Sequence, residues 1–165
     1  MAIGRKAFMK VNIAVKSEDN EMDWKEINSE NDINDLLKTF GGFHDGVLRE
    51  MHLWNDYYVD EDLRMDSGDG MLNAKVLFQR QGKEPSVIEI IFLGIDKINI
   101  VSTPPNYWYM IFDATWVYKE GLYYWAEVGD WEIEDNSVTW LSSQNIKWRS
   151  VDGWLGSKLR YGSSR

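Results

Sequence analysis

Apolar and polar residues alternate along most of this chain, with the period of two that is typical of half-buried β-strands. The alternation predicts strands at residues 9–15, 47–54, 72–78, 88–92 and 107–118, and shorter ones around 123–128, 131–134, 138–141 and 146–149. Turn residues separate these runs at short intervals, which leaves no room for the crossover helices that parallel strands require. We therefore expect a mainly antiparallel β-sheet.

One segment follows the helical period instead. Its apolar residues recur at i, i+3, i+4 and i+7: Ile33, Leu36, Leu37 and Phe40. Ser29 and Asp32 precede this run in the arrangement of a capping box, and Gly41 and Gly42 follow it, as at many helix ends. The pattern predicts one principal α-helix at about residues 30–40, and with the strands it predicts an α+β fold.

The length of 165 residues suits one domain, which we place at residues 1–155, with a flexible basic tail at 156–165. The chain has no Cys, which excludes disulfides and suits a reducing compartment. Residues 1–15 are too polar for a signal-peptide core, and the longest apolar run, Ile90–Ile95, is too short to span a bilayer. We expect a cytoplasmic protein without a membrane anchor.

The net charge of −9 is concentrated in two segments. Ser17–Asp35 holds eight acidic residues against one Lys, and Asn55–Gly70 holds six against one Arg. If the fold brings these segments together into one exposed docking face, their field attracts a basic protein partner and repels nucleic acid. The alternative is that both segments are solvated loops that keep the protein soluble.

The predicted partner-binding surface combines acidic residues of the two segments with neighbouring aromatic residues. Its members are Asp19, Glu21, Asp23, Tyr57, Tyr58, Asp60, Glu61 and Asp62. Within the second segment, Asp66–Gly70 lacks the ligand spacing of an EF-hand, so we interpret it as a turn.

A His-Asp pair lies between the helix and the next strand, in the segment Phe43, His44, Asp45 and Gly46. A carboxylate beside an imidazole can orient a general base or a metal ligand. Adjacent residues of a strand point to opposite faces, however, which favours a structural loop that ties down the helix end. His52 is the only other histidine, and no ligand spacing, nucleophile elbow or phosphate loop is present. We therefore expect no metal and no cofactor.

Aromatic residues are concentrated in the C-terminal part, with thirteen of the 23 between Tyr107 and Trp154. One interpretation is a carbohydrate-binding domain or glycosidase, in which Trp125, Trp131 and Trp140 stack on sugar rings. Glu127, Asp130 or Glu132 would then supply the carboxylates. The other interpretation is that these rings form the hydrophobic core, as alternating aromatic residues on strands usually do.

A resemblance to a known group of proteins rests on two short segments. These are Phe43, His44, Asp45 and Gly46, which precede a predicted strand, and Ile146–Arg149 near the C-terminus. The chain resembles a loosely defined group of small bacterial proteins, some of them immunity proteins of contact-dependent or polymorphic toxin systems. The resemblance implies a cytosolic, non-enzymatic protein that neutralises a toxin by binding it. An acidic inhibitor with aromatic anchors can occlude a basic substrate groove by complementary charge.

Overall fold

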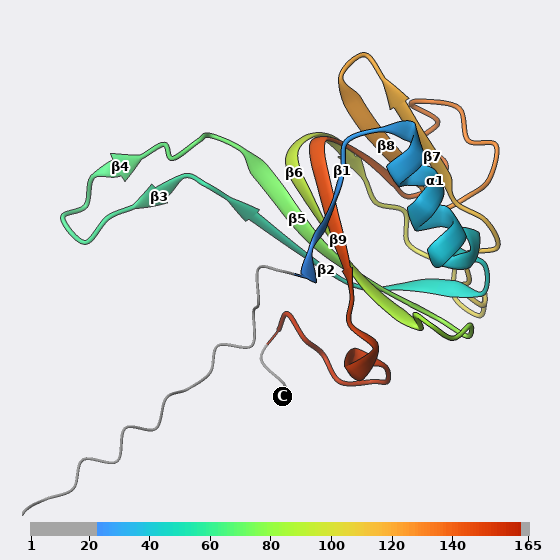
Figure 1. Ribbon diagram of the computed structural model, residues 1–165. Helices are drawn as coiled ribbons and strands as arrows, with labels where there is room; N and C mark the ends of the chain where they lie inside the picture. The colour runs from blue at the N-terminus through green and yellow to red at the C-terminus, as the bar shows by residue number, and fades with distance from the viewer. Residues whose placement is uncertain (1–22, 163–165) are drawn as a thin grey trace, which may run out of the picture.

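A computed structural model describes residues 23–162, which form a curved antiparallel sheet with one helix against it (Figure 1). The predicted strand at 9–15 and the candidates Asp19 and Glu21 lie outside the described residues. The elements are β1 Lys25–Ile27, α1 Glu30–Thr39, η2 Gly41–Phe43, β2 Gly46–Asn55, β3 Tyr58–Val59, β4 Met65–Asp66, β5 Leu72–Arg80, β6 Val87–Asn99, β7 Thr115–Lys119, β8 Leu122–Ala126, β9 Trp140–Ser150 and η3 Asp152–Trp154.

The main sheet has seven strands, six of them in the order β2-β5-β6-β9-β8-β7. The seventh, β1, lies on the same side of β9 as β8: β8 pairs with the first part of β9 and β1 with a later part. Every strand pair is antiparallel, which confirms the expected mainly antiparallel sheet with a principal helix. The backbone of Gly46 also exchanges two hydrogen bonds with Ile111, at 2.7 and 3.4 Å. This bridge joins the start of β2 to the segment that leads into β7.

Helix α1 begins and ends as its sequence predicts. The Ser29 hydroxyl accepts the backbone N–H of Asp32, and the Asp32 carboxylate accepts the N–H of Asn28. At the other end, the Phe40 N–H bonds to Leu36 O, and Gly41 follows with a positive φ. The caps satisfy backbone groups that the helix leaves unpaired at its ends.

The core lies between α1 and one face of the sheet, called the inner face. Ile33 and Leu36 of the helix and Phe40, which caps its C-terminus, are buried against sheet residues that include Phe78 and Trp125. The rings of Phe78 and Trp125 meet edge to face at 5.1 Å between centroids. Much of the aromatic excess is therefore core, because large rings bury the most apolar area per residue.

The predicted strand at 107–118 is wrong over most of its length, since β7 begins only at Thr115. Residues 100–114 form an irregular connection, here called the aromatic loop. Pro104 and Pro105 supply no backbone N–H, and the Tyr107 N–H turns back to Pro104 O, which ends strand pairing there. Residues 131–134 also form no strand, and the two runs predicted at 138–141 and 146–149 are one continuous strand, β9.

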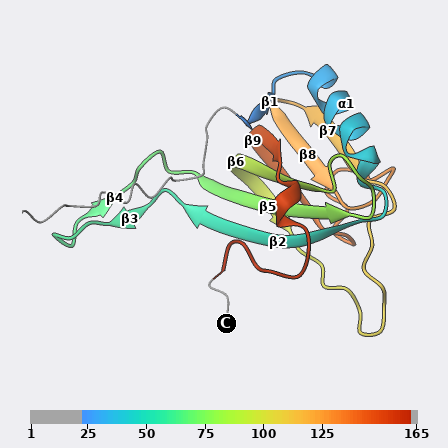
Figure 2. The ribbon, with the colours of Figure 1, turned by 60° about the horizontal axis from the view of Figure 1, so that its bottom comes forward.

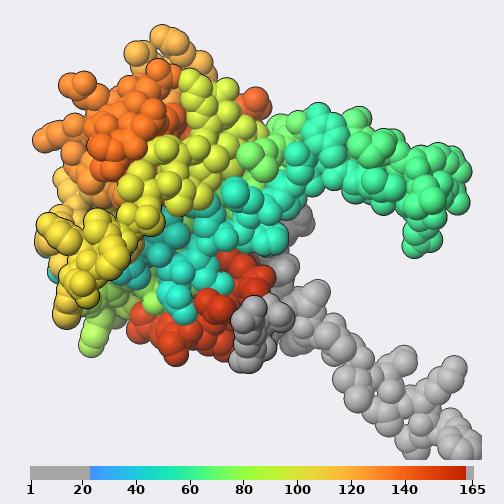
Figure 3. All heavy atoms as spheres, turned by 180° about the vertical axis from the view of Figure 1, so that it is seen from behind, coloured from blue at the N-terminus to red at the C-terminus, as the bar shows by residue number. Residues whose placement is uncertain are grey.

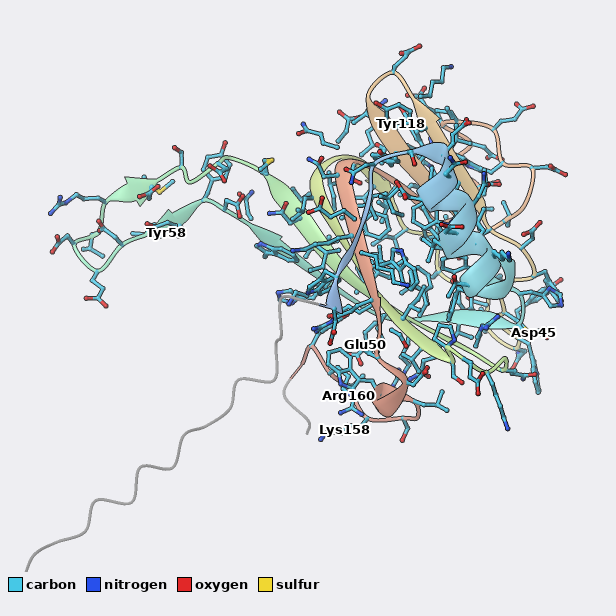
Figure 4. All side chains as sticks on the ribbon, viewed as in Figure 1. Asp45, Glu50, Tyr58, Tyr118, Lys158 and Arg160 are labelled. Carbon is cyan, nitrogen blue, oxygen red and sulfur yellow. The ribbon has the colours of Figure 1, made fainter. Side chains whose placement is uncertain are left out.

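Residues 156–162, which the sequence analysis assigned to a basic tail, lie on the outer face of the sheet. The backbone N–H of Arg160 donates to Glu50, and Figure 4 shows these two residues close together. The Tyr161 hydroxyl donates to Glu89 at 2.9 Å, and Glu89 forms a buried ion pair with Arg149 at 2.8 Å. Within residues 23–162, no helix is long and apolar enough to cross a membrane.

Candidate functional site

The connection between β2 and β5, residues 56–71, extends away from the sheet as a hairpin and is here called the arm (Figures 1 and 3). Its two short strands pair Tyr58 with Asp66 and Val59 with Met65. It contains the predicted contact residues Tyr57, Tyr58, Asp60, Glu61 and Asp62. The structure therefore brings five of the eight candidates together on one projection.

Two arm carboxylates hold the hairpin in shape. One oxygen of Asp60 accepts the backbone N–H groups of Asp62 and Arg64, both at 2.9 Å, which fixes the turn at the tip. Asp66 accepts the Gly68 N–H and the Tyr58 hydroxyl. These bonds lower the pKa of Asp66, the Gly68 bond most, and the bond to Asp66 raises the pKa of Tyr58. Asp60 and Asp66 therefore serve the local fold of the arm.

Asp56 accepts the side-chain N–H of Asn73 at 3.1 Å, whereas Glu61, Asp62 and Asp69 are exposed to solvent. Asp62 pairs with Arg64 at 2.6 Å, and that arginine is the only cation between Asn55 and Gly70. For Glu61 and Asp69, no hydrogen bond or ion pair is found among residues 23–162. An uncompensated cluster of this kind produces a negative potential that attracts cations.

The arm also exposes large apolar side chains. Leu63 is 86% exposed, Met65 is 77% exposed and Val59 is 55% exposed. An isolated two-stranded hairpin has marginal stability in water, and exposed apolar residues add nothing to it. Exposed apolar groups rimmed by charge are characteristic of protein interaction sites. The sequence pattern did not indicate these three residues, because it predicted no strand in this segment.

The two acidic segments do not form the single docking face that we expected, as far as the described residues show. Glu30, Asp32 and Asp35 belong to α1, which lies at the opposite end of the sheet from the arm in Figures 1 and 2. Asp23 is exposed just before β1, whose residues pair with β9. The candidate surface is therefore the arm alone.

The segment Phe43–Gly46 makes the contacts of a structural loop. Phe43 is fully buried and packs edge to face on Phe40 and Phe78. The His44 ring donates its Nδ1–H to Phe112 O at 2.6 Å, and Asp45 O accepts the Gln81 N–H. The nearest oxygen of the Asp45 carboxylate lies 3.7 Å from Nε2 of His44, with both side chains on the surface. His44 thus ties the aromatic loop to the end of the helix.

The proposed sugar platform of Trp125, Trp131 and Trp140 is wrong, because these side chains are only 0%, 7% and 3% exposed. Glu127 is also engaged: one oxygen accepts the Tyr109 hydroxyl and the other accepts the Thr139 N–H, both at 2.8 Å. Burial, and next the bond to Glu127, raise the pKa of Tyr109. The three most exposed aromatic side chains belong instead to the aromatic loop: Tyr107, Trp108 and Phe112.

Among residues 23–162 there is no group of three His, Cys, Asp or Glu side chains placed to hold a metal ion. Comparisons of the chain with protein-family models, curated proteins and solved structures find no match. The geometry of the arm and of its surroundings is therefore the basis for a functional assignment.

Proposed function

We propose that this protein is a cytoplasmic, non-enzymatic binding module that neutralises a basic protein partner, as an immunity protein neutralises its toxin. The observation that supports the proposal most is the arm, which combines exposed Leu63 and Met65 with uncompensated Glu61 and Asp69. Apolar anchors supply affinity when a partner desolvates them, and the surrounding charge selects the partner and speeds association.

The immunity assignment rests on the resemblance of the Phe43–Gly46 and Ile146–Arg149 segments. Its physical requirement is an acidic surface that can enter the basic substrate groove of a nuclease-type toxin. A hairpin that stands clear of the body, as the arm does in Figure 3, has the shape for such an insertion. A partner of this kind carries a surplus of Lys and Arg around an apolar cleft.

The test is site-specific photocross-linking from two matched positions. Tyr58 on the arm is 55% exposed and Tyr118 at the other end of the molecule is 52% exposed (Figure 4). A photoreactive benzoylphenylalanine is placed at one or the other position, and the protein is irradiated in a lysate of the organism that makes it. We expect position 58 to give one dominant adduct with a basic protein, identified by mass spectrometry, and position 118 to give none.

The identified partner is then purified and its activity is measured with increasing amounts of the wild-type protein or of the Glu61→Gln, Asp69→Asn double variant. We expect inhibition by the wild type and weaker inhibition by the variant at low salt, with the difference shrinking as salt screens the charges. Equal adduct patterns from both positions, or a partner that the wild type does not inhibit, would contradict the proposal.

A second candidate function is glycan binding by the aromatic loop, on different rings from those that the sequence suggested. Trp108 is 91% exposed and borders a cavity of about 310 Å³ that Tyr109 and Glu127 also line. Stacking of a sugar ring on an exposed indole changes its fluorescence, so a glycan panel is compared on the wild type and on Trp108→Ala. A flat response of the wild type across the panel eliminates this candidate.

A further inference from the structure

The free edge of β2 and the cavity beside it form a second feature that the arm alone does not explain. β2 is the terminal strand of the sheet and pairs with β5 on one side. On its other side, only Gly46 has a backbone partner among residues 23–162, namely Ile111. From Met51 onward no backbone group of residues 23–162 pairs with this edge, and an open strand edge is a template for another strand.

The direction of the unpaired groups follows from the alternation of a strand. Asp56 donates its N–H to Met71 O, toward the β5 side. Alternate residues of an antiparallel strand direct their backbone groups to opposite sides, so those of Met51, Leu53 and Asn55 point to the free side. The backbone groups of Gly46 point to the same free side, since they bond to Ile111. Gly46 and Met51 are an odd number of residues apart, and the bulge between Leu48 and Glu50 adds the one residue that brings both to the same side.

A cavity of about 250 Å³ lies between β2 and the aromatic loop, on the inner face of the sheet, and is here called the edge pocket. It is lined by Leu48, Met51, Ile100, Val101, Thr103, Tyr109 and Thr139. No charged side chain lines it, and its size suits one or two aliphatic side chains. Leu53, further along β2, is 42% exposed and extends this apolar surface toward the arm.

The arm and the aromatic loop lie at opposite ends of the free edge. Figures 2 and 3 show β2 running between them, with the arm continuing from its end and the aromatic loop beside its start. A strand added to β2 would therefore have the apolar edge pocket near one end and the acidic arm near the other. Arg160, whose backbone N–H donates to Glu50, lies toward the outer face (Figure 4).

We propose that β2 binds an extended segment of the partner as an additional strand, with an aliphatic side chain in the edge pocket and lysine or arginine side chains toward the arm. This inference rests on the proposed function for the basic character of the partner. The unpaired backbone groups give affinity for any extended chain, while the pocket and the charge gradient select the sequence and its direction.

The test uses a peptide of about seven residues, enough to cover Arg49–Asn55 at about 3.4 Å per residue. Lysine alternates with valine in its first half, and leucine and valine occupy its second half, because antiparallel pairing with β2 places the first half beside the arm and the second half beside the edge pocket. Two control peptides carry glutamate for lysine, or N-methyl groups that remove the backbone donors on one edge. Binding is measured by NMR titration, and amide exchange is followed residue by residue.

The matched variants are Leu53→Pro and Leu53→Ala. Proline removes the N–H that points to the free side, which an edge strand tolerates, whereas alanine shortens the side chain and keeps the donor. We expect Leu53→Pro to weaken binding by roughly tenfold and Leu53→Ala by no more than about threefold. The Met51 and Leu53 amides should gain exchange protection, and both control peptides should bind more weakly.

The outcomes separate this inference from the proposed function. Chemical shift changes confined to the arm, or equal binding by Leu53→Pro and the wild type, would overturn strand addition and leave the arm as the binding surface. An absence of peptide binding together with a cross-link from position 58 would also overturn strand addition and leave the arm as the binding surface. Protection of β2 by the peptide without any cross-link from position 58 would support strand addition and contradict the proposed function. Thermal unfolding of Leu53→Pro verifies that the variant is folded.

Discussion

The inner face of the sheet and the arm use the same kinds of residue in opposite ways. Trp125 and Phe78 are fully buried in the core, whereas Leu63 and Met65 on the arm are almost fully exposed. Burial of a large side chain stabilises the fold by about 1.5–3 kcal/mol, while an exposed one contributes almost nothing to it. The difference teaches that folding explains the apolar residues of the core and does not explain those of the arm, which is why we propose a binding role for them.

The largest effect should come from truncating the core. Trp125→Ala leaves a cavity among Phe78 and its neighbours, and we expect it to lower the free energy of unfolding by about 3–5 kcal/mol. Trp108→Ala is the matched control, because that indole is 91% exposed, and it should stay within about 0.5 kcal/mol of the wild type. Urea unfolding measures the stability of both variants. A similar loss of stability in the two would contradict the difference between buried and exposed aromatic residues.

Tyr161→Phe tests the C-terminal segment on the outer face. It removes the hydrogen bond to the buried, charged Glu89, and we expect a loss of about 1.5–3 kcal/mol. Tyr118→Phe is the exposed control and should be nearly neutral. A neutral Tyr161→Phe would mean that the hydrogen bond from Tyr161 to Glu89 adds nothing to the stability of the domain.

The same tyrosine predicts a pH dependence. Burial and the charge of Glu89 raise the pKa of Tyr161 above its ordinary value of 10.0. Its contribution to stability is therefore fully present below pH 10.0 and is lost as the pH rises through the higher folded-state pKa. The melting temperature should fall less steeply with rising alkaline pH for Tyr161→Phe than for the wild type. Parallel melting curves for the two proteins would contradict the raised pKa of Tyr161.

On the arm, Leu63→Ala should change stability by less than about 0.5 kcal/mol, because the side chain is 86% exposed. The yield of the cross-link from position 58 should fall by at least about fivefold if Leu63 anchors the partner. Unfolding and cross-linking are measured on the same preparation. A stability loss without a binding loss would assign Leu63 to the fold.

The sequence predicted elements whose causes are local. The Ser29 cap, the apolar spacing of α1 and the short turns were sufficient for the helix and for the antiparallel sheet. The strand predicted at 107–118 was wrong because aromatic alternation also occurs where Pro104 and Pro105 interrupt pairing. Which aromatic residues are buried depends on contacts between distant segments, and alternation alone does not reveal it.

The candidate surface was predicted in part for the same reason. Tyr57, Tyr58, Asp60, Glu61 and Asp62 were selected by charge and lie together on the arm. The separation of the arm from α1 depends on the order of strands in the sheet, which the sequence pattern does not give. The open edge of β2 is likewise a property of topology, since the alternation at residues 47–54 is the same whether a strand lies at the edge or inside the sheet.

The most direct test of the central claim is to shorten the arm and measure folding and binding together. Replacement of residues 57–70 by Asn-Gly keeps the Asp56–Met71 hydrogen bond and closes β2 and β5 with a two-residue turn. We predict a free energy of unfolding within about 1 kcal/mol of the wild type and loss of inhibition of the partner identified by cross-linking. Unfolding of the shortened protein, or undiminished inhibition by it, would contradict the account.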